Sequence, residues 1–364
     1  MRVDLTFTPY RLALTRPWTS AHGHFAARCG WLVSARADGA CGYGDCAPLP
    51  AAGTETSAAA WRRLCEAGRT IHRCGASPGA GTPLDRWLQA LDQVPRSPTP
   101  AADFALDCAF SDLASRLAGT SLRRWLAGTA GDAVPVNGAL GALMHTTAAD
   151  LAGAARAGLL VVKLKVGIAP SALELQHLHA LAAILPPGLR LRLDANRAWD
   201  RATAAQVVGA LADLPVESLE EPLSAPDWPT LAALQARAPF PLALDESVAA
   251  LAETLDQARF PVRRIVLKPA AIGGLRRTLR LARRLQAAGI ETVITSLVES
   301  AAGLWPTAQL AAAIGSPIPQ GLATADWLRE DLGLAPPLRG GLLHLPDTPG
   351  SGFAPAGAPP APGA

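Results

Sequence analysis

From about residue 130 onward, short apolar runs alternate with amphipathic helical patterns. The eight runs cover residues 134–140, 159–167, 189–194, 216–222, 241–247, 263–269, 290–296 and 316–322. Strand-like runs alternating with helical patterns are typical of parallel βα units, whose buried strands are apolar on both faces. Eight such units favour an α/β barrel.

Polar pairs at capping spacing predict where three barrel helices begin. The pairs are Thr147 with Asp150, Ser171 with Glu174, and Thr203 with Gln206. In a capping box, the first side chain accepts from the backbone N–H of the residue three positions on, whose own side chain reaches back. We therefore expect a helix to start at each pair.

Residues 1 to about 128 have a different order of elements. The strand-like pieces come first and the helical patterns follow, at 4–14, 30–39 and 41–50, then around 57–70, 84–93 and 102–118. This order predicts a separate α+β domain. Residues 355–364 contain no apolar side chain larger than proline, so we expect a disordered tail there.

Composition narrows the class of protein. The 364 residues are 49% hydrophobic and carry a formal net charge of +3, which allows a large core and argues against nucleic acid as a partner. Residues 300–325 carry no charge, but prolines and glutamines interrupt them, which disfavours a membrane span. The N-terminus lacks the apolar block of a signal peptide. We expect a cytoplasmic protein whose six cysteines are free thiols.

Lysine is almost absent from the chain. The 33 basic residues comprise 30 arginines and three lysines, Lys163, Lys165 and Lys268. Arginine can replace lysine on a surface but stays protonated, whereas a buried lysine amine can accept and return a proton. Two of the three lysines share one apolar run, so chance survival explains them poorly. We interpret all three as candidates for acid/base chemistry.

Charged residues end five consecutive apolar runs of the predicted barrel. They are Lys163 with Lys165, then Asp194, Glu220, Asp245 and Lys268, about one βα unit apart. Singly, each has a structural explanation such as a helix cap, a turn or a surface position. Together they favour a site, because the carboxyl ends of barrel strands converge. Three converging carboxylates would repel one another unless a divalent cation, most commonly Mg²⁺, neutralised them.

This arrangement suits removal of a proton α to a carboxylate. The proton is weakly acidic, so the enediolate needs concentrated positive charge, and a lysine of depressed pKa can act as the base. The substrate class that this chemistry predicts is a small-molecule carboxylate.

Several motifs carry a family resemblance. They include GYGDCAPLP at 42–50, FALDCAFSDLASRLAG at 104–119, LRLDANRAWD at 191–200, ITSLVES at 294–300, and IPQGLATADWLRED at 318–331. With the spacing of the lysines and carboxylates, they resemble the muconate lactonising enzyme subgroup of the enolase superfamily, and within it the o-succinylbenzoate synthases. Asp45 stands where the subgroup usually has Glu, and Ala323 where many relatives have Gly.

The resemblance implies a modified TIM barrel, (β/α)7β, with an N-terminal α+β capping domain. The implied boundaries are 1–128 for the capping domain, 129–328 for the barrel and 329–354 for a C-terminal segment that returns to the capping domain. It also implies that residues 20–28 form a mobile loop over the site, in which His22 and His24 are loop residues and not metal ligands.

The resemblance further implies a role for each candidate residue. Lys165 is the base, Lys268 stabilises the enediolate from the opposite face, and Lys163 lowers the pKa of Lys165 and contacts the substrate carboxylate. Glu221 supports the site from behind the ligands. The implied ligands of Mg²⁺, which Mn²⁺ could replace, are Asp194, Glu220 and Asp245. The implied substrate contacts are Asn137, Asn196, Ser296 and Glu299, with a turn as the alternative role for Asn196.

The reaction implied by the resemblance is dehydration of 2-succinyl-6-hydroxy-2,4-cyclohexadiene-1-carboxylate in menaquinone biosynthesis. The same residues would also serve an N-acylamino acid racemase or a dipeptide epimerase, so these remain alternatives. A non-catalytic metal-binding relative is a third possibility, although a structural role would have accepted arginine at the lysine positions. Both a monomer and a homo-oligomer are compatible with the sequence.

Overall fold

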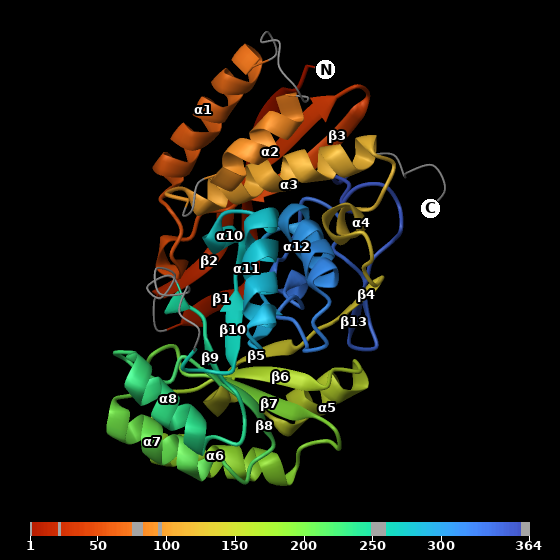
Figure 1. Ribbon diagram of the computed structural model, residues 1–364. Helices are drawn as coiled ribbons and strands as arrows, with labels where there is room; N and C mark the ends of the chain where they lie inside the picture. The colour runs from red at the N-terminus through yellow and green to blue at the C-terminus, as the bar shows by residue number, and fades with distance from the viewer. Residues whose placement is uncertain (1, 21–22, 75–82, 94–96, 249–259, 358–364) are drawn as a thin grey trace.

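The N-terminal domain is a three-stranded antiparallel sheet packed against helices. The computed structural model describes residues 2–20, 23–74, 83–93, 97–248 and 260–357. Strands and helices follow the expected order: β1 (Asp4–Ser20), β2 (Gly23–Ala37), β3 (Ala40–Cys46), α1 (Ser57–Cys74), α2 (Pro83–Gln93) and α3 (Pro100–Leu117). The α+β prediction is therefore confirmed. Figure 1 shows this domain, in red to orange, at one end of the molecule.

Two glycines explain how closely β3 approaches α3. A Cβ at Gly42 would lie 2.2 Å from the backbone oxygen of Ala109, and one at Gly44 would lie 2.1 Å from that of Ala105. Any larger residue would collide with the helix backbone, so the GYG motif permits direct strand-to-helix packing. A cluster of buried side chains from β2 and the three helices, including Val33, forms the core beside this contact.

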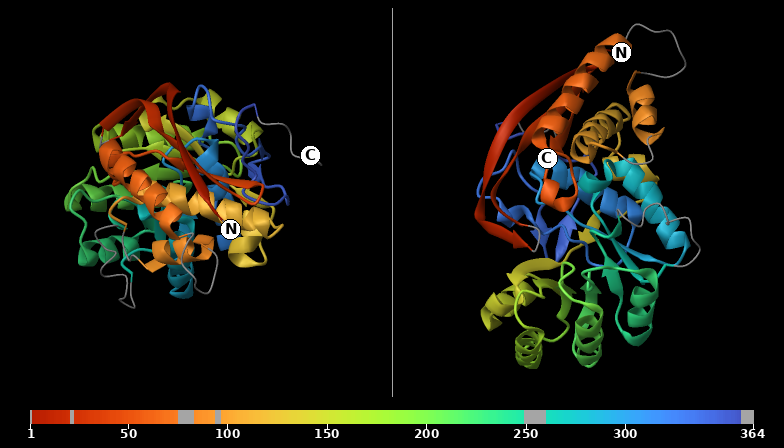
Figure 2. Two further views of the ribbon diagram at one scale, coloured as in Figure 1. Left: turned by 90° about the horizontal axis from the view of Figure 1, so that it is seen from above. Right: turned by 90° about the vertical axis from the view of Figure 1, so that its left-hand side faces the viewer.

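The second domain is built on a curled sheet of seven parallel strands. Its order is β11-β10-β9-β8-β7-β6-β5. The strands are β5 (Gly138–Ala142), β6 (Val161–Lys165), β7 (Arg190–Asp194), β8 (Val216–Glu220), β9 (Leu242–Leu244), β10 (Arg264–Leu267) and β11 (Glu291–Ile294). Helices cover the outside of the sheet: α5 (Ala148–Arg156), α6 (Ser171–Ala183), α7 (Arg201–Ala210), α8 (Trp228–Arg237), α11 (Leu275–Ala287) and α12 (Ala301–Ile314). The short α10 (Pro269–Ile272) lies instead against α3 of the N-terminal domain. The right-hand view of Figure 2 shows the green helices of this domain at the end of the molecule opposite the red N-terminal sheet.

The eighth apolar run closes the barrel without forming a full strand. Gln320 bridges Val136 on one edge of the sheet, and Gly321 bridges Thr295 on the other. The Asn137 N–H donates to the Gln320 oxygen at 2.9 Å. Pro317 and Pro319 have no N–H, which prevents a continuous ladder along this run. The (β/α)7β barrel with a capping domain is confirmed as the fold class.

The C-terminal segment joins both domains. Its strands β12 (Leu338–Arg339) and β13 (Leu342–His344) form a small sheet with β4 (Ala133–Pro135). Further on, the Ser351 N–H donates to Asp112 of α3 at 2.5 Å. Pro355 bridges Gly333, and Ala356 donates to the Leu332 oxygen at 2.7 Å. The expectation of disorder is therefore wrong for residues 355 and 356, whereas 358–364 lie outside the described residues.

One of the three expected capping boxes forms. Thr147 and Asp150 cap α5 reciprocally. At α7 the expected Thr203–Gln206 box is wrong, because Asp200 is the N-cap and accepts from the Thr203 N–H at 2.7 Å. Asp is preferred over Thr as an N-cap residue, and the helix begins three residues before the expected position.

The Ser171–Glu174 box at α6 is also wrong. Pro170 occupies the N-cap position, and Glu174 instead accepts from the N–H groups of Gly167, Ile168 and Ala169 at 2.7, 2.9 and 3.0 Å. Its carboxylate satisfies three donors of the loop after β6 instead of the one donor that a capping box offers it. Glu174 thereby fixes the chain just beyond Lys165.

The expected loop at 20–28 belongs to a β-hairpin. Ser20 ends β1, and residues 23–28 are part of β2, with Leu12 paired to Arg28. Residues 21 and 22, and with them His22, lie outside the described part of the chain. No helix in the described residues is long and apolar enough to cross a membrane.

Candidate active site

The candidate lysines and carboxylates meet at the carboxyl ends of the barrel strands. Lys165 ends β6 and is in register with Asp194 at the end of β7, which is in register with Glu220 at the end of β8. Asp245 directly follows β9, and Lys268 directly follows β10. The three carboxylate residues are 1%, 2% and 9% exposed, respectively. The sequence spacing therefore predicted a real spatial cluster.

Each carboxylate in the cluster forms an ion pair with a lysine. Lys163 Nζ lies 2.8 Å from Asp194 Oδ2 and also contacts Glu220 Oε2. Lys165 Nζ lies 2.7 Å from the same Asp194 oxygen, and Lys268 Nζ lies 2.6 Å from Asp245 Oδ2. All three lysines of the chain thus take part in one buried charge cluster.

Burial and pairing act against each other on the pKa values of these groups. Burial by itself raises the pKa of Asp194, but Lys163 and Lys165 outweigh it and hold that pKa well below its usual range. Burial lowers the pKa of Lys163, but Asp194 and Glu220 outweigh it and raise that pKa. Burial also raises the pKa of Asp245, against the opposing effect of Lys268. The lysine charges are therefore the counter-charges of the carboxylates.

The donor set fits a hard divalent cation. Three carboxylates on adjacent strands supply the oxygen ligands that Mg²⁺ prefers, and their burial makes a counter-charge necessary. Among the described residues, no group of three or more His, Cys, Asp or Glu side chains is already arranged as a cation site. The carboxylates are instead paired with ammonium groups, so a bound cation would take over part of that pairing.

Glu221 holds the chain that follows β9. It has a φ of 45° and accepts from the backbone N–H groups of Asp245 and Ser247 at 2.7 and 2.8 Å, and from the Ser247 hydroxyl at 2.7 Å. Burial, with a contribution from nearby Glu246, raises the pKa of Glu221 to about 7. Glu221 therefore fixes the end of β9 from which Asp245 projects, the supporting position expected for it.

The four expected substrate contacts lie in different surroundings. Asn196 belongs to the cluster, since its Oδ1 accepts from Lys165 Nζ at 2.6 Å and its Nδ2 donates to Glu246 at 2.8 Å. Its φ of 43° also suits the turn that was the alternative role. Asn137 is buried, and its Oδ1 accepts from Arg192 at 2.8 Å.

Ser296 and Glu299 lie beyond the seventh strand. The hydroxyls of Ser296 and Thr324 are 2.8 Å apart, and Glu299 accepts from the Leu297 N–H at 2.8 Å. These hydrogen bonds and that of Asn137 go to groups other than the lysines, and the substrate roles of all three residues stay predictions.

Two residues near the site were not predicted from the sequence. Glu246 holds Asn196, and its only signal is that it directly follows Asp245. Arg28 is buried and contacts the segment beyond β11. Because that contact spans 270 positions of the chain, no local pattern could have indicated it.

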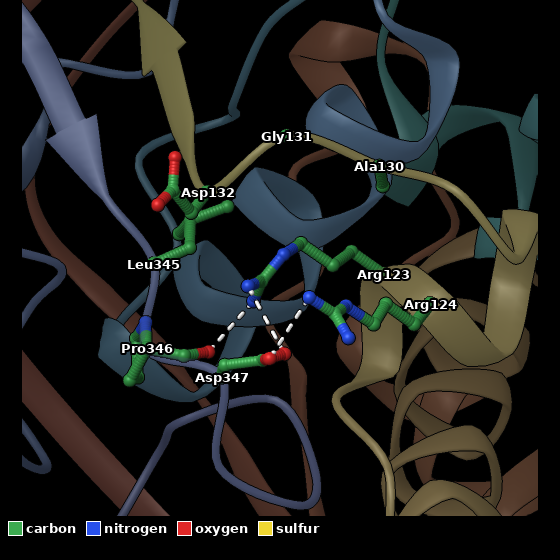
Figure 3. Close-up of a pocket in the computed structure, with 8 residues that line it drawn as sticks. All are labelled: Arg123, Arg124, Ala130, Gly131, Asp132, Leu345, Pro346 and Asp347. Atoms are coloured by element: carbon green, nitrogen blue, oxygen red, sulfur yellow. Dashed lines mark hydrogen bonds and ion pairs between the residues drawn. The ribbon is translucent and has the colours of Figure 1, made fainter.

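A cavity of about 510 Å³ lies elsewhere, between α4 (Leu122–Ala127), the chain just before β4 and the chain after β13. Figure 3 shows that its two arginines, Arg123 and Arg124, both pair with Asp347. The charges of the positive and negative side chains that line the cavity cancel, and none of the candidate catalytic residues lines it. We therefore place the site at the strand ends and not in this cavity.

Comparison with known proteins identifies the class and then the family. A family model described as enolase C-terminal domain-like matches residues 146–358. An o-succinylbenzoate synthase from Edwardsiella ictaluri is 30% identical, over 90% of this chain and 92% of its own length. The chain therefore belongs to the enolase superfamily and, within it, to the family of these o-succinylbenzoate synthases.

Solved structures show the same fold. The chain is similar to a muconate lactonizing enzyme from Pseudomonas fluorescens, complexed with muconolactone, at a TM-score of 0.84 and 24% identity, over 97% of this chain and 96% of the other. It is also similar to a dipeptide epimerase from Methylococcus capsulatus, complexed with Mg and a dipeptide, at a TM-score of 0.82 and 26% identity, over 97% and 99%. Both likenesses extend over nearly the whole of each chain and show that the fold is shared.

Proposed function

We propose that this chain is a Mg²⁺-dependent o-succinylbenzoate synthase of menaquinone biosynthesis. It would convert 2-succinyl-6-hydroxy-2,4-cyclohexadiene-1-carboxylate to o-succinylbenzoate by syn elimination of water. The observation that carries the proposal is the cluster of all three lysines with three buried carboxylates. The name of the Edwardsiella ictaluri relative supports this substrate over others of the superfamily.

Lys165 is the proposed base. Its Nζ would take the proton α to the substrate carboxylate and then return a proton to the departing hydroxide on the same face, so that one group serves both steps. Asn196 Oδ1, 2.6 Å from Nζ, fixes the direction of the amine. An arginine could not perform this role, because it does not release its proton near neutral pH.

Lys268 and Lys163 supply positive charge around the developing enediolate. Lys268 is held by Asp245, and Lys163 by Asp194 and Glu220, so their ammonium groups have fixed positions before substrate binds. Preorganised charge of this kind stabilises an oxyanion without reorganisation. A divalent cation held by Asp194, Glu220 and Asp245 would add positive charge for the same enediolate.

The direct experiment is an assay of the purified protein with the cyclohexadiene carboxylate. We expect the aromatic product to form in the presence of Mg²⁺, and Lys165→Arg to abolish its formation while the variant stays folded. A panel of N-acylamino acids and dipeptides serves as the comparison. Turnover of the panel without dehydration would contradict the synthase proposal.

A racemase or epimerase is the second candidate. Lys165 and Lys268 would then exchange the α proton from opposite faces, and the Methylococcus capsulatus dipeptide epimerase, at 26% identity, favours keeping this option. Exchange of solvent deuterium into an N-acylamino acid or dipeptide, with inversion of configuration, would identify it. The third possibility, a metal-binding relative without activity, predicts neither dehydration nor exchange. Cytoplasmic location and oligomeric state stay predictions in all three cases.

A further inference from the structure

The segment after the seventh barrel strand contains a strained residue. Val298 has a φ of 60°, in the left-handed region. Of the described non-glycine residues with positive φ, the other four are Asp38, Asn196, Arg197 and Glu221, so Val298 alone is β-branched. A β-branched residue is a genuine outlier in this region, and such a conformation persists only where surrounding contacts impose it.

Arg28 of the capping domain supplies one of those contacts. This side chain is 2% exposed, and its Nε donates to the Val298 oxygen at 3.2 Å. The same guanidinium donates to the oxygens of Ala47 at 2.5 Å and Pro48 at 3.4 Å, in the segment that follows β3. One buried arginine therefore joins β2, the chain after β3 and the strained residue of the barrel.

Asp45 of the capping domain holds the far end of the same segment. Its Oδ2 accepts from the backbone N–H and the hydroxyl of Ser300 at 2.7 and 2.8 Å, and its Oδ1 accepts from the Tyr10 hydroxyl. Ser300 is the N-cap of α12, so a carboxylate from the other domain holds the residue at which this barrel helix begins. The Val298 side chain meanwhile packs with Leu12 of β1 in a small apolar cluster.

The held segment borders the lysine–carboxylate cluster. It directly follows β11, whose Ile294 is in register with Leu267, the residue before Lys268. The Thr295 N–H donates to the Leu267 oxygen at 3.0 Å. A displacement of residues 296–300 would therefore change the wall of the site on the Lys268 side.

We propose that Arg28 and Asp45 are positioning residues, which clamp the strained segment 296–300 so that the capping domain sets the shape of the site beside Lys268. The proposal concerns how the site binds its substrate and rests on the proposed function only for its kinetic test. Because Val298 is strained, we expect the segment to relax to another conformation when these contacts are removed.

The first test is hydrogen–deuterium exchange in the full-length protein. Arg28→Met keeps the aliphatic stem and removes the donors, and we expect faster exchange in the peptide that contains 296–300, with little change in the outer barrel helices. The matched control is Arg11→Met, an exposed arginine of β1 next to Leu12, which is the register partner of Arg28. Unchanged exchange at 296–300 in Arg28→Met would overturn the proposal, whether or not the enzyme is a synthase.

The second test is a double-mutant cycle on the substrate that the wild type turns over. We expect Arg28→Met to lower kcat/KM by about 10- to 100-fold, mainly through KM, with the Mg²⁺ activation constant unchanged. Glycine adopts positive φ freely, so Arg28→Met should cost much less in the Val298→Gly background. Equal losses in both backgrounds would contradict the clamp.

Arg28→Lys covers the case in which Arg28→Met does not fold. It keeps the buried charge but cannot reach all three carbonyl groups in the same geometry, so we expect intermediate exchange and kinetics. Wild-type behaviour in Arg28→Lys would show that charge alone suffices and would overturn the role given to the three hydrogen bonds. Absence of dehydration in the wild type would reject the proposed function but not the exchange result.

Discussion

Asp194 has the most heavily shared carboxylate of the site. Its Oδ2 lies within ion-pair distance of both Lys163 and Lys165, while its Oδ1 accepts from the Asn196 N–H at 3.0 Å. Removing the charge of this buried group would leave two ammonium groups facing each other with less compensation. A single residue thus governs both the lysine positions and the proposed cation site.

At this residue we predict that Asp194→Asn weakens metal binding and activity together. Chelation should abolish turnover in the wild type, and Mg²⁺ or Mn²⁺ should restore it, whereas the variant should need a much higher Mg²⁺ concentration. Titration of activity against metal concentration measures both effects. Full activity of the wild type in excess chelator would be incompatible with the proposed cation site.

At the scale of elements, a bulge in β8 places Glu217 between two arginines. The register shifts between Leu191 and Arg192 of β7, so Glu217 is the extra residue of β8. Its carboxylate lies 2.9 Å from Arg192 and 2.5 Å from Arg264 of β10. Burial would raise the pKa of Glu217, but the two arginines outweigh it and lower the pKa to about 2.

This lowered pKa predicts a pH dependence of stability. Because the folded pKa lies below the unfolded value, the pair stabilises the fold above about pH 4.5, and the stabilisation is lost as the pH falls toward 2. Glu217→Gln should cost on the order of 3 kcal/mol at pH 7, and its difference from the wild type should shrink at lower pH. Urea unfolding at several pH values measures this, with the exposed Glu66→Gln as control. Parallel pH profiles of wild type and Glu217→Gln would contradict the argument.

The helix caps lead to a second prediction at the scale of elements, which concerns the free energy of unfolding. Thr147 caps α5 reciprocally, so Thr147→Ala should lower the free energy of unfolding by about 1 kcal/mol. Ser171 has the same sequence signature but no cap hydrogen bond, and Ser171→Ala should be close to neutral. Chemical denaturation of both variants tests the comparison, and equal losses would show that the observed cap has no special effect.

At the scale of the whole molecule, the spacing of the charged strand ends along the chain predicted more of the structure than local sequence motifs did. The strand ends that carry Asp194, Glu220 and Asp245 were predictable, because buried parallel strands are apolar runs that recur about once per βα unit. The role of Glu174 was not, since it depends on which loop donors are left unsatisfied after β6. The seam at Gln320 depends on two distant strands at once and has no local signal.

The contacts that join the two domains were the least predictable feature of the fold. Contacts from Arg28 and Asp45 to the segment 296–300 cross more than 250 positions of the chain, at 270 for Arg28 and 255 for Asp45. The sequence motif around Asp45 indicated a capping domain, yet not that its carboxylate holds Ser300, the N-cap residue of α12. Such contacts are tertiary and follow only once both domains are folded together.

The central claim is that Lys165 moves the proton. Lys165→Arg keeps the charge near Asp194 but replaces the proposed base with a guanidinium, which stays protonated in proteins, whereas Lys268→Arg keeps the positive charge assigned to that position. The measurement is the rate of dehydration together with solvent deuterium exchange at the α carbon of the substrate, in wild type and both variants. We predict that Lys165→Arg lowers the rates of dehydration and of deuterium exchange by about 10² to 10⁴-fold. Lys268→Arg should keep a measurable fraction of the dehydration rate. Dehydration by folded Lys165→Arg at close to the wild-type rate would contradict the central claim.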